Sequence, residues 1–283
     1  MRAHWGVVPP VVIVAELGSN HDGSLGAAMA LASAAIDAGC DVVKLQDHRG
    51  QVIAPDAAHP PWMHPAAAAA ESRHDYIVRT CFSASEWTTL SSHVRSRGAK
   101  FAVSPFSVGA LACQLRGGRL DVVKIASGQI SNAPLLRMAS ESGLPVHVSC
   151  GMTSPKETLA ALGEAAWSMG KLTVLHCTSE YPCAPEHVNL GSLPPVWIPK
   201  CAVWGFSDHT LGNAASLAAI ALGAAVVERH VGWDRRCCSS DAQHSLTIDE
   251  FAAFVREVRG LERMLAPAEP VPTLAATRAV FLA

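Results

Sequence analysis

The chain has 283 residues, of which 49% are hydrophobic and 16% are charged, and its formal net charge is -2. That length and apolar content suffice for one large core. No basic block is present, no signal peptide is recognisable, and no apolar run of about 20 residues suggests a membrane span. The nine cysteines are scattered and without CxxC spacing. We therefore expect a cytoplasmic protein with free thiols and with neither nucleic-acid nor membrane partners.

Short apolar runs rich in β-branched residues recur along the chain, as is typical of strands buried on both faces. In order they are 11–16, 41–46, 100–104, 121–127, 145–149, 172–178, 202–207 and 225–230. Ala- and Leu-rich segments of helical length lie between them, among them 24–39, 83–98, 154–170, 210–223 and 247–265. Several begin at Ser or Thr, which can cap a helix. This alternation predicts an α/β fold, a single (β/α)8 TIM barrel.

Two segments fall outside the alternation. Residues 47–82 form a long insertion after the second strand, and a connection of that length is expected to act as an active-site loop or lid. Residues 266–283 continue from the last helix through a Pro-rich stretch. We expect one catalytic barrel over residues 1–265, followed by a tail and no second domain.

Polar side chains stand at the end of nearly every expected strand, where a barrel of this kind carries its chemistry. They are Glu16, Lys44, Gln46, Ser104, Lys124, Ser127, Ser149, His176, Thr178, Ser207, Asp208, His209, Glu228 and His230. Any one of them could be a satisfied core residue or half of a buried ion pair. So many strands ending in this way favour a functional site. Lysines on two strands and hydroxyls on several others suit a phosphate or a carboxylate.

Two histidines, His209 and His230, end neighbouring strands. With a carboxylate from Glu16, Glu228 or Asp241 they suit Mn, Fe or Zn and leave coordination positions open. Such an ion polarises a carbonyl group. A metal beside an anion site indicates an enzyme in which a phosphorylated substrate meets a carbonyl compound.

The eighth run, AVVERH, ends on three ionisable side chains. His230 is expected at the metal. Glu228 either supports the site from behind or pairs with a neighbouring cation. Arg229 has the opposite orientation along the strand and is expected to form a structural ion pair in the helical layer.

These motifs resemble the sialic acid synthase family, whose members condense phosphoenolpyruvate with an aldehyde sugar. The matching pieces are AELGSNHDGS (15–24), DVVKLQ (41–46), SPFS (104–107), VKIASGQISNAPLL (123–136), VSCGMTS (148–154), LHCTSEYPCAPEHVNL (175–190), FSDHTLG (206–212) and VVERH (226–230), then Asp241. They extend over about residues 11–265. FSDHTLG followed by ERH is highly specific, whereas NHDG alone is weak.

The resemblance implies a role for each matching position. His209 and His230 match two metal ligands, with Mn²⁺ as the expected ion and Mg²⁺ or Co²⁺ as alternatives. The positions that match the phosphoenolpyruvate-binding set are Lys44, Lys124, Ser127, Ser149 and Ser207, with Ser104 alongside. The positions that match contacts to the acceptor sugar are Glu16, Gln46, Tyr181 and Asp241.

The resemblance also implies a reaction. The enol carbon of phosphoenolpyruvate attacks the acceptor aldehyde, water adds at C2, and phosphate leaves by C–O cleavage. The product is a 2-keto acid. The lysines hold phosphate and carboxylate throughout, so that charge is preorganised where it is needed.

Three features depart from the family pattern. Family synthases continue into a small antifreeze-like domain that covers the partner's site, and we expect none here, which leaves acceptor recognition and a homodimer open. Gln129 stands where many members have Glu and cannot titrate, so Glu16 or a water would take any acid–base role. Ser179 replaces an Asn of some members and can still donate to a phosphate.

We therefore expect a metal-dependent synthase that joins phosphoenolpyruvate to a sugar or sugar-like aldehyde, with Glu16, Lys44, Lys124 and Gln129 as its catalytic residues. One alternative is a metal-dependent aldolase or isomerase that does not use phosphoenolpyruvate, against which the two lysines argue. Another is a catalytically inactive barrel with a binding or regulatory role, against which the presence of the site residues argues.

Overall fold

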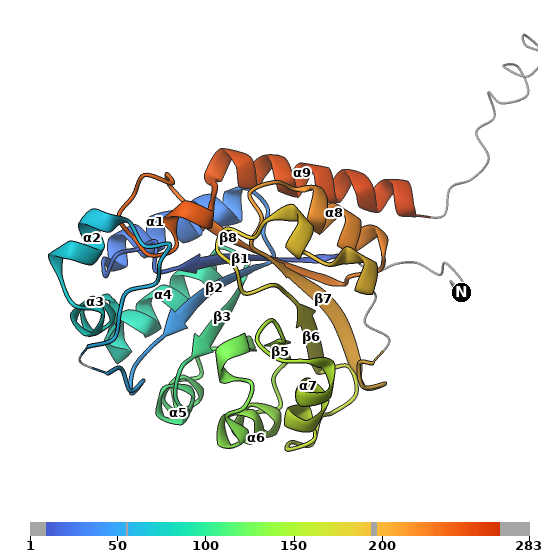
Figure 1. Ribbon diagram of the computed structural model, residues 1–283, viewed down its shortest axis with the longest axis horizontal. Coiled ribbons are helices and arrows are strands. Elements are labelled where there is room, and N and C mark those ends of the chain that lie inside the picture. Colours follow the sequence, from blue (N-terminus) through green and yellow to red (C-terminus); the bar gives the residue numbers. More distant parts are fainter. Residues whose placement is uncertain (1–9, 55, 194–196, 267–283) are drawn as a thin grey trace, which may run out of the picture.

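The computed structural model describes residues 10–54, 56–193 and 197–266, which form a closed parallel barrel surrounded by helices (Figure 1). The barrel strands are β1 (Val12–Gly18), β2 (Val42–Asp47), β3 (Lys100–Pro105), β4 (Val122–Ile125), β5 (Val146–Ser149), β6 (Leu172–His176), β7 (Ala202–Asp208) and β8 (Val226–Gly232). Each strand pairs in parallel with the next, and β8 pairs with β1 to close the barrel. The predicted (β/α)8 fold is confirmed. The expected tail, 266–283, lies outside the described residues except for its first position.

The surrounding helices follow the strands in chain order. They are α1 (Leu25–Asp37), α4 (Ala84–Ser96), α5 (Val108–Arg116), α6 (Ala133–Glu141), α7 (Pro155–Leu162), α8 (Ala214–Ala221) and α9 (Ile248–Leu265). Helices α4, α7 and α9 begin with a capping box, in which a Ser or Thr side chain and a Glu three residues later satisfy each other's backbone amides. In the described part of the chain, no helix is both long and apolar enough to cross a membrane.

Several predicted boundaries were wrong, for local reasons. The fourth and sixth strands end at Ile125 and His176 rather than at 127 and 178, and Ser127 already begins the 3-10 turn η1 (Ser127–Gln129). Helix α7 ends at Leu162, eight residues early, where Gly163 forms its C-cap. Helix α8 begins only at Ala214, because Arg229 takes the carbonyls of residues 210 and 212.

The insertion at 47–82 contains regular structure that the sequence did not reveal. It includes two short helices, α2 (Pro65–Ala70) and α3 (Arg73–Thr80), which lie at one side of the barrel (Figure 1). A further short strand, β9 (Leu246–Thr247), pairs with the end of β8. The segment between β8 and β9 is therefore fixed at both ends.

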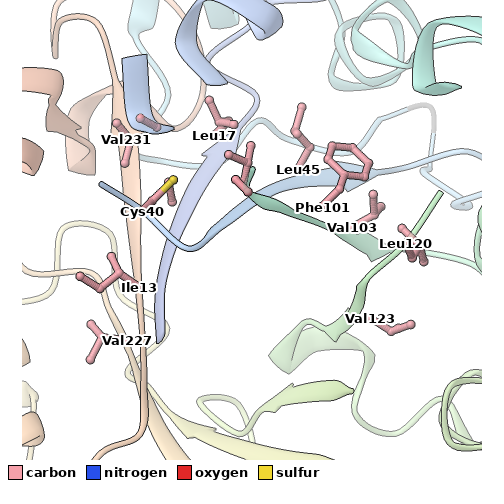
Figure 2. Packing of buried hydrophobic residues seen from close by; sticks show 14 of the residues in the cluster. Ile13, Leu17, Cys40, Leu45, Phe101, Val103, Leu120, Val123, Val227 and Val231 are labelled. Carbon is pink, nitrogen blue, oxygen red and sulfur yellow. The ribbon is translucent and has the colours of Figure 1, made fainter. Parts of the chain in front are cut away.

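Alternating side chains divide each strand between two environments. One set faces outward and packs against the helices in the main core, where Figure 2 shows Ile13, Leu45, Phe101 and Val227. The other set faces the barrel axis. There an apolar layer containing Val14, Val42, Ala102, Val122, Leu175 and Val226 closes the lower interior. Two residues further along their strands, Glu16, Lys44, Lys124 and Glu228 follow on the same face. The strand period thus places a charged layer on an apolar floor.

Arg229 lies in the helical layer, as the alternation predicts. Its guanidinium bonds Asp208 at 2.8 Å and lies over the ring of Phe254 at 5.6 Å from the centroid. Both charged side chains are almost completely buried. The expected structural ion pair is confirmed.

Replacing Arg229 with Ala should lower the free energy of unfolding by about 3–5 kcal/mol, because Asp208 would be left as a buried and unpaired carboxylate. Urea unfolding followed by circular dichroism measures the change. The matched control is Arg236→Ala, which removes an exposed pair with Asp234 and should leave stability unchanged. Equal stability of the two variants would contradict a structural role for the buried pair.

Candidate active site

The polar strand ends meet in a small cavity of about 60 Å³ at the carboxyl end of the barrel. Most of the predicted site residues line it: Glu16, Lys44, Gln46, Ser104, Lys124, Ser127, Ser149, Tyr181, Ser207, His209 and His230. We call this the inner cavity. Glu228 and Cys177 also contribute to its wall. Residues from all parts of the sequence converge here because parallel strands end at the same rim.

The charged layer described above, with four buried ionisable side chains, lies at the bottom of the inner cavity. The Lys44 ammonium lies 2.7 Å from a carboxylate oxygen of Glu16 and 3.5 Å from Glu228, and Lys124 lies 2.7 Å from the same Glu228 oxygen. Lys44 also donates to the Ser104 hydroxyl at 3.1 Å. Of the two roles left open for Glu228, the structure therefore shows pairing with cations.

The two carboxyl groups of this cluster differ in their affinity for a proton. Burial raises the pKa of Glu16 to about 7, although Lys44 opposes the shift. Burial acts on Glu228 in the same sense, but Lys124 and Lys44 outweigh it and hold its pKa well below the ordinary value. Glu16 can therefore exchange a proton near neutral pH while Glu228 remains ionised. Such a separation of paired carboxyls is typical of acid–base sites.

His209 and His230 line the same cavity as neutral imidazoles, and His230 is the β8 residue paired in register with Glu16. Burial lowers the pKa of His209 to about 4 and that of His230 well below 6.5. The Nδ1 of His209 lies 2.7 Å from the Thr178 carbonyl oxygen, so Nε2 is its remaining nitrogen for a ligand. The ring centroids of the two histidines are 5.7 Å apart, and Nδ1 of His230 is buried without a hydrogen-bond partner among the described residues. Neutral rings with an orphaned nitrogen fit a divalent cation.

A larger outer cavity of about 280 Å³ adjoins this site. The 47–82 insertion contributes His59, Trp62, Arg73 and Tyr76 to its lining. The Trp62 ring packs on Tyr181 with centroids 4.7 Å apart, and Tyr181 borders both cavities. The outer cavity is therefore larger and more aromatic than the inner one.

Three predicted residues lie outside the inner cavity. Asp241 lines the outer cavity. Ser179 lines neither cavity, and its hydroxyl bonds that of Ser127 at 3.1 Å. Gln129 is in η1, where it accepts a hydrogen bond from Asn132, and it lines neither cavity. A role for Gln129 in catalysis stays a prediction without geometric support.

Two histidines at the site were missed in the sequence. His48 bonds Gln46 through Nε2 at 2.9 Å, and Gln46 in turn donates to Glu16 at 2.8 Å, so His48 fixes the amide that faces the inner cavity. His48 stands two residues after Gln46, and side chains two residues apart in an extended segment lie on the same face. This spacing was the signal in the sequence. His244 lies in the 3-10 turn η4 (Ala242–His244), where its ring is 4.5 Å from that of His230. Its spacing of three residues from Asp241 was the only sequence signal.

A (β/α)8 barrel in which two buried lysines and two neutral imidazoles line one cavity is the architecture of a barrel enzyme for an anionic substrate. The chain belongs to the NeuB family, whose model matches residues 31–269. This confirms the resemblance drawn from the motifs.

Named relatives agree with this assignment. The chain is 31% identical over 258 residues to the N,N'-diacetyllegionaminic acid synthase of Campylobacter jejuni, covering 90% of this chain and 77% of that protein. It is also 31% identical over 266 residues to the N-acetylneuraminate-9-phosphate synthase of Mus musculus, covering 90% and 71%. The crystal structure of the N-acetylneuraminic acid synthetase from Leptospira borgpetersenii is similar with a TM-score of 0.77 and 26% identity, covering 96% of this chain and 91% of that one.

Glu16 should titrate near pH 7 in the ligand-free protein, because burial disfavours its charged form. Its carboxyl would carry a proton at pH 6 and be ionised at pH 8. Isotope-edited infrared difference spectra should show a protonated carboxyl band that disappears over this range and is absent in Glu16→Gln. A band that disappears near pH 4.5 instead would contradict the arrangement described.

Proposed function

We propose that this chain condenses phosphoenolpyruvate with a sugar or sugar-like aldehyde, giving a nonulosonate-like 2-keto acid and phosphate. NeuB family synthases carry out condensations of this class. The observation that carries the proposal is the pair of buried lysines, Lys44 and Lys124, in a cavity shared with His209 and His230. A metal-dependent aldolase or isomerase would activate its carbonyl group through the ion and would not need two buried ammonium groups.

The inner cavity supplies the donors that a phosphorylated carboxylate requires. Lys44 and Lys124 neutralise charge, while the hydroxyls of Ser104, Ser127, Ser149 and Ser207 offer directional hydrogen bonds. In the ligand-free protein the lysines are satisfied by Glu16 and Glu228. A phosphate or carboxylate group of the incoming substrate would replace some of these carboxylate contacts to the lysines. The cations are therefore already placed and desolvated before the substrate arrives.

The outer cavity suits the acceptor. Tyr181 and Trp62 offer apolar ring faces, and the amide of Gln46 offers hydrogen bonds to hydroxyl groups. Both Tyr181 and His230 border the two cavities. An aldehyde held against them would face the enol carbon of phosphoenolpyruvate in the inner cavity.

The proposed ion site begins with His209 and His230, and the expected ion is Mn²⁺, with Mg²⁺ or Co²⁺ as alternatives. When bound, the ion would polarise the acceptor carbonyl as a Lewis acid. The chain's own residues hold the reactants and move protons. Glu16, with its pKa near 7, is positioned to take up or release the proton that accompanies water addition.

The direct test is release of inorganic phosphate from phosphoenolpyruvate in the presence of a divalent metal and a panel of aldoses. We expect acceptor-dependent phosphate release matched by an equal amount of 2-keto acid. If no acceptor supports phosphate release in metal-loaded protein, the proposed reaction is wrong.

Lys124→Met should raise the dissociation constant for phosphoenolpyruvate by at least about 30-fold, because losing one buried charge partner costs about 2 kcal/mol or more. Isothermal titration calorimetry measures the change, with circular dichroism confirming the fold. Lys156→Met, an exposed lysine on α7, is the matched control and should bind as the parent does. Equal affinity in both variants would exclude Lys124 from the anion site.

A further inference from the structure

We propose that Asp241 and His244 join His230 as protein ligands of the divalent ion in this chain. The inference deepens the proposed function by placing the ion at His230, Asp241 and His244, a set that shares His230 with the histidine pair named above and does not require His209. It rests on the proposed function only for the ion's purpose. One ligand atom from each of the three residues lies within 4.8 Å of the others. All three residues are buried.

His244 is the strongest sign that something is bound here. The residue is only 2% exposed, yet neither Nδ1 nor Nε2 has a hydrogen-bond partner among the described residues. Buried polar atoms are rarely left unpaired, since each costs desolvation energy without return. The Nδ1 of His230 is orphaned in the same way. Two neighbouring imidazoles with unused nitrogens therefore point to a shared ligand.

The separations within the group suit a metal better than a hydrogen bond. The His244 Nε2 and Asp241 Oδ1 atoms are 3.8 Å apart, which is too long for a hydrogen bond. Ligand atoms at about 2.0–2.1 Å from a tetrahedral ion lie roughly 3.4 Å from one another. A small inward movement would bring this pair to that separation.

Asp241 is held firmly through one carboxylate oxygen, while the other accepts only a long hydrogen bond, at 3.4 Å, from the Ser240 hydroxyl. Its Oδ2 accepts from the Ser19 backbone amide at 2.7 Å and from the Ser19 hydroxyl at 3.2 Å. This approach requires Gly18, because a Cβ there would lie 1.9 Å from Oδ2. Oδ1 is the oxygen that faces His244. Fixing one oxygen of a ligating carboxylate while the other binds is the usual arrangement around metals.

The loop that carries Asp241 and His244 is itself fastened to the end of β1. Asn20 donates to the Val231 carbonyl and to the Ser245 hydroxyl, both at 2.8 Å, and accepts from Ser239. These bonds fix both sides of the loop and so preorganise its side chains. Asn20, the first residue of the NHDG motif, therefore has a structural role.

The chemistry of this set predicts metal preference. Two imidazoles and one carboxylate suit Co²⁺, Zn²⁺, Fe²⁺ or Mn²⁺, whereas Mg²⁺ prefers oxygen ligands and retained waters. His230 and Asp241 also line the outer cavity, so open coordination positions would face the acceptor. We expect Co²⁺ and Zn²⁺ to bind far more tightly than Mg²⁺.

The test measures metal binding by apoprotein in the absence of phosphoenolpyruvate and sugar. Calorimetry with Co²⁺ gives the affinity, and the visible d–d spectrum reports the ligand set. His244→Ala and Asp241→Asn should each weaken Co²⁺ binding by about 100-fold or more and alter the spectrum, since even supporting residues cost about 10–100-fold. His187→Ala, an exposed histidine that lines neither cavity, should change nothing.

Anomalous diffraction at the cobalt edge from wild-type crystals covers the case of a variant that does not fold. A cobalt peak bonded to His230, Asp241 and His244 supports the inference. Parental Co²⁺ affinity and spectrum in both variants, or a peak bonded to His209 and His230 alone, overturns it. Because no substrate is present, either result is independent of whether the protein releases phosphate from phosphoenolpyruvate.

Discussion

The buried cluster of Lys44, Glu16, Glu228 and Lys124 is the constraint on which the site depends. An isolated charge in the barrel would cost several kcal/mol, so each lysine needs a carboxylate while the substrate is absent. The carboxylates keep the ammonium groups desolvated and in place. Because Glu16 has a pKa near 7, the cluster can lose one negative charge at little cost and favour an incoming anion. The charges are therefore organised during folding, before the reaction begins.

The strand pattern explains how much of this could be predicted. A barrel strand alternates strictly, so the positions of Val42 and Lys44 in the sequence already place one on the apolar floor and the other in the charged layer. The same alternation places Arg229 on the outer face of β8, where it pairs with Asp208. Residues at the carboxyl ends of different strands must converge at one rim. The fold and the strand-end residues of the inner cavity therefore followed from local periodicity and from the shared rim of the barrel, whereas Tyr181 was predicted there only from the family resemblance.

What the sequence did not show depends on contacts between distant segments. Helix α2 is a run of alanines after Pro65 and buries none of its residues, and the eight-residue α3 buries only Tyr76 and Thr80. Helix α3 is also fixed by tertiary contacts such as the hydrogen bond from the Ser240 amide to Tyr76. His244 lies beside His230 because Asn20 ties the β8–β9 loop to β1 and because β9 pairs with the end of β8. The choice between two roles for Glu228 likewise needed the positions of Lys44 and Lys124 across the barrel. None of these distances is encoded in residue spacing along the chain.

A crystal structure with phosphoenolpyruvate bound tests the central claim most directly. The phosphate and carboxylate oxygens should lie within hydrogen-bond distance of Lys44 and Lys124, with hydroxyls of the inner-cavity serines completing the shell. The enol carbon should face His230 and the outer cavity. Phosphoenolpyruvate bound elsewhere, with both lysines still paired to Glu16 and Glu228, would contradict the assignment of this cluster as the substrate's anion site.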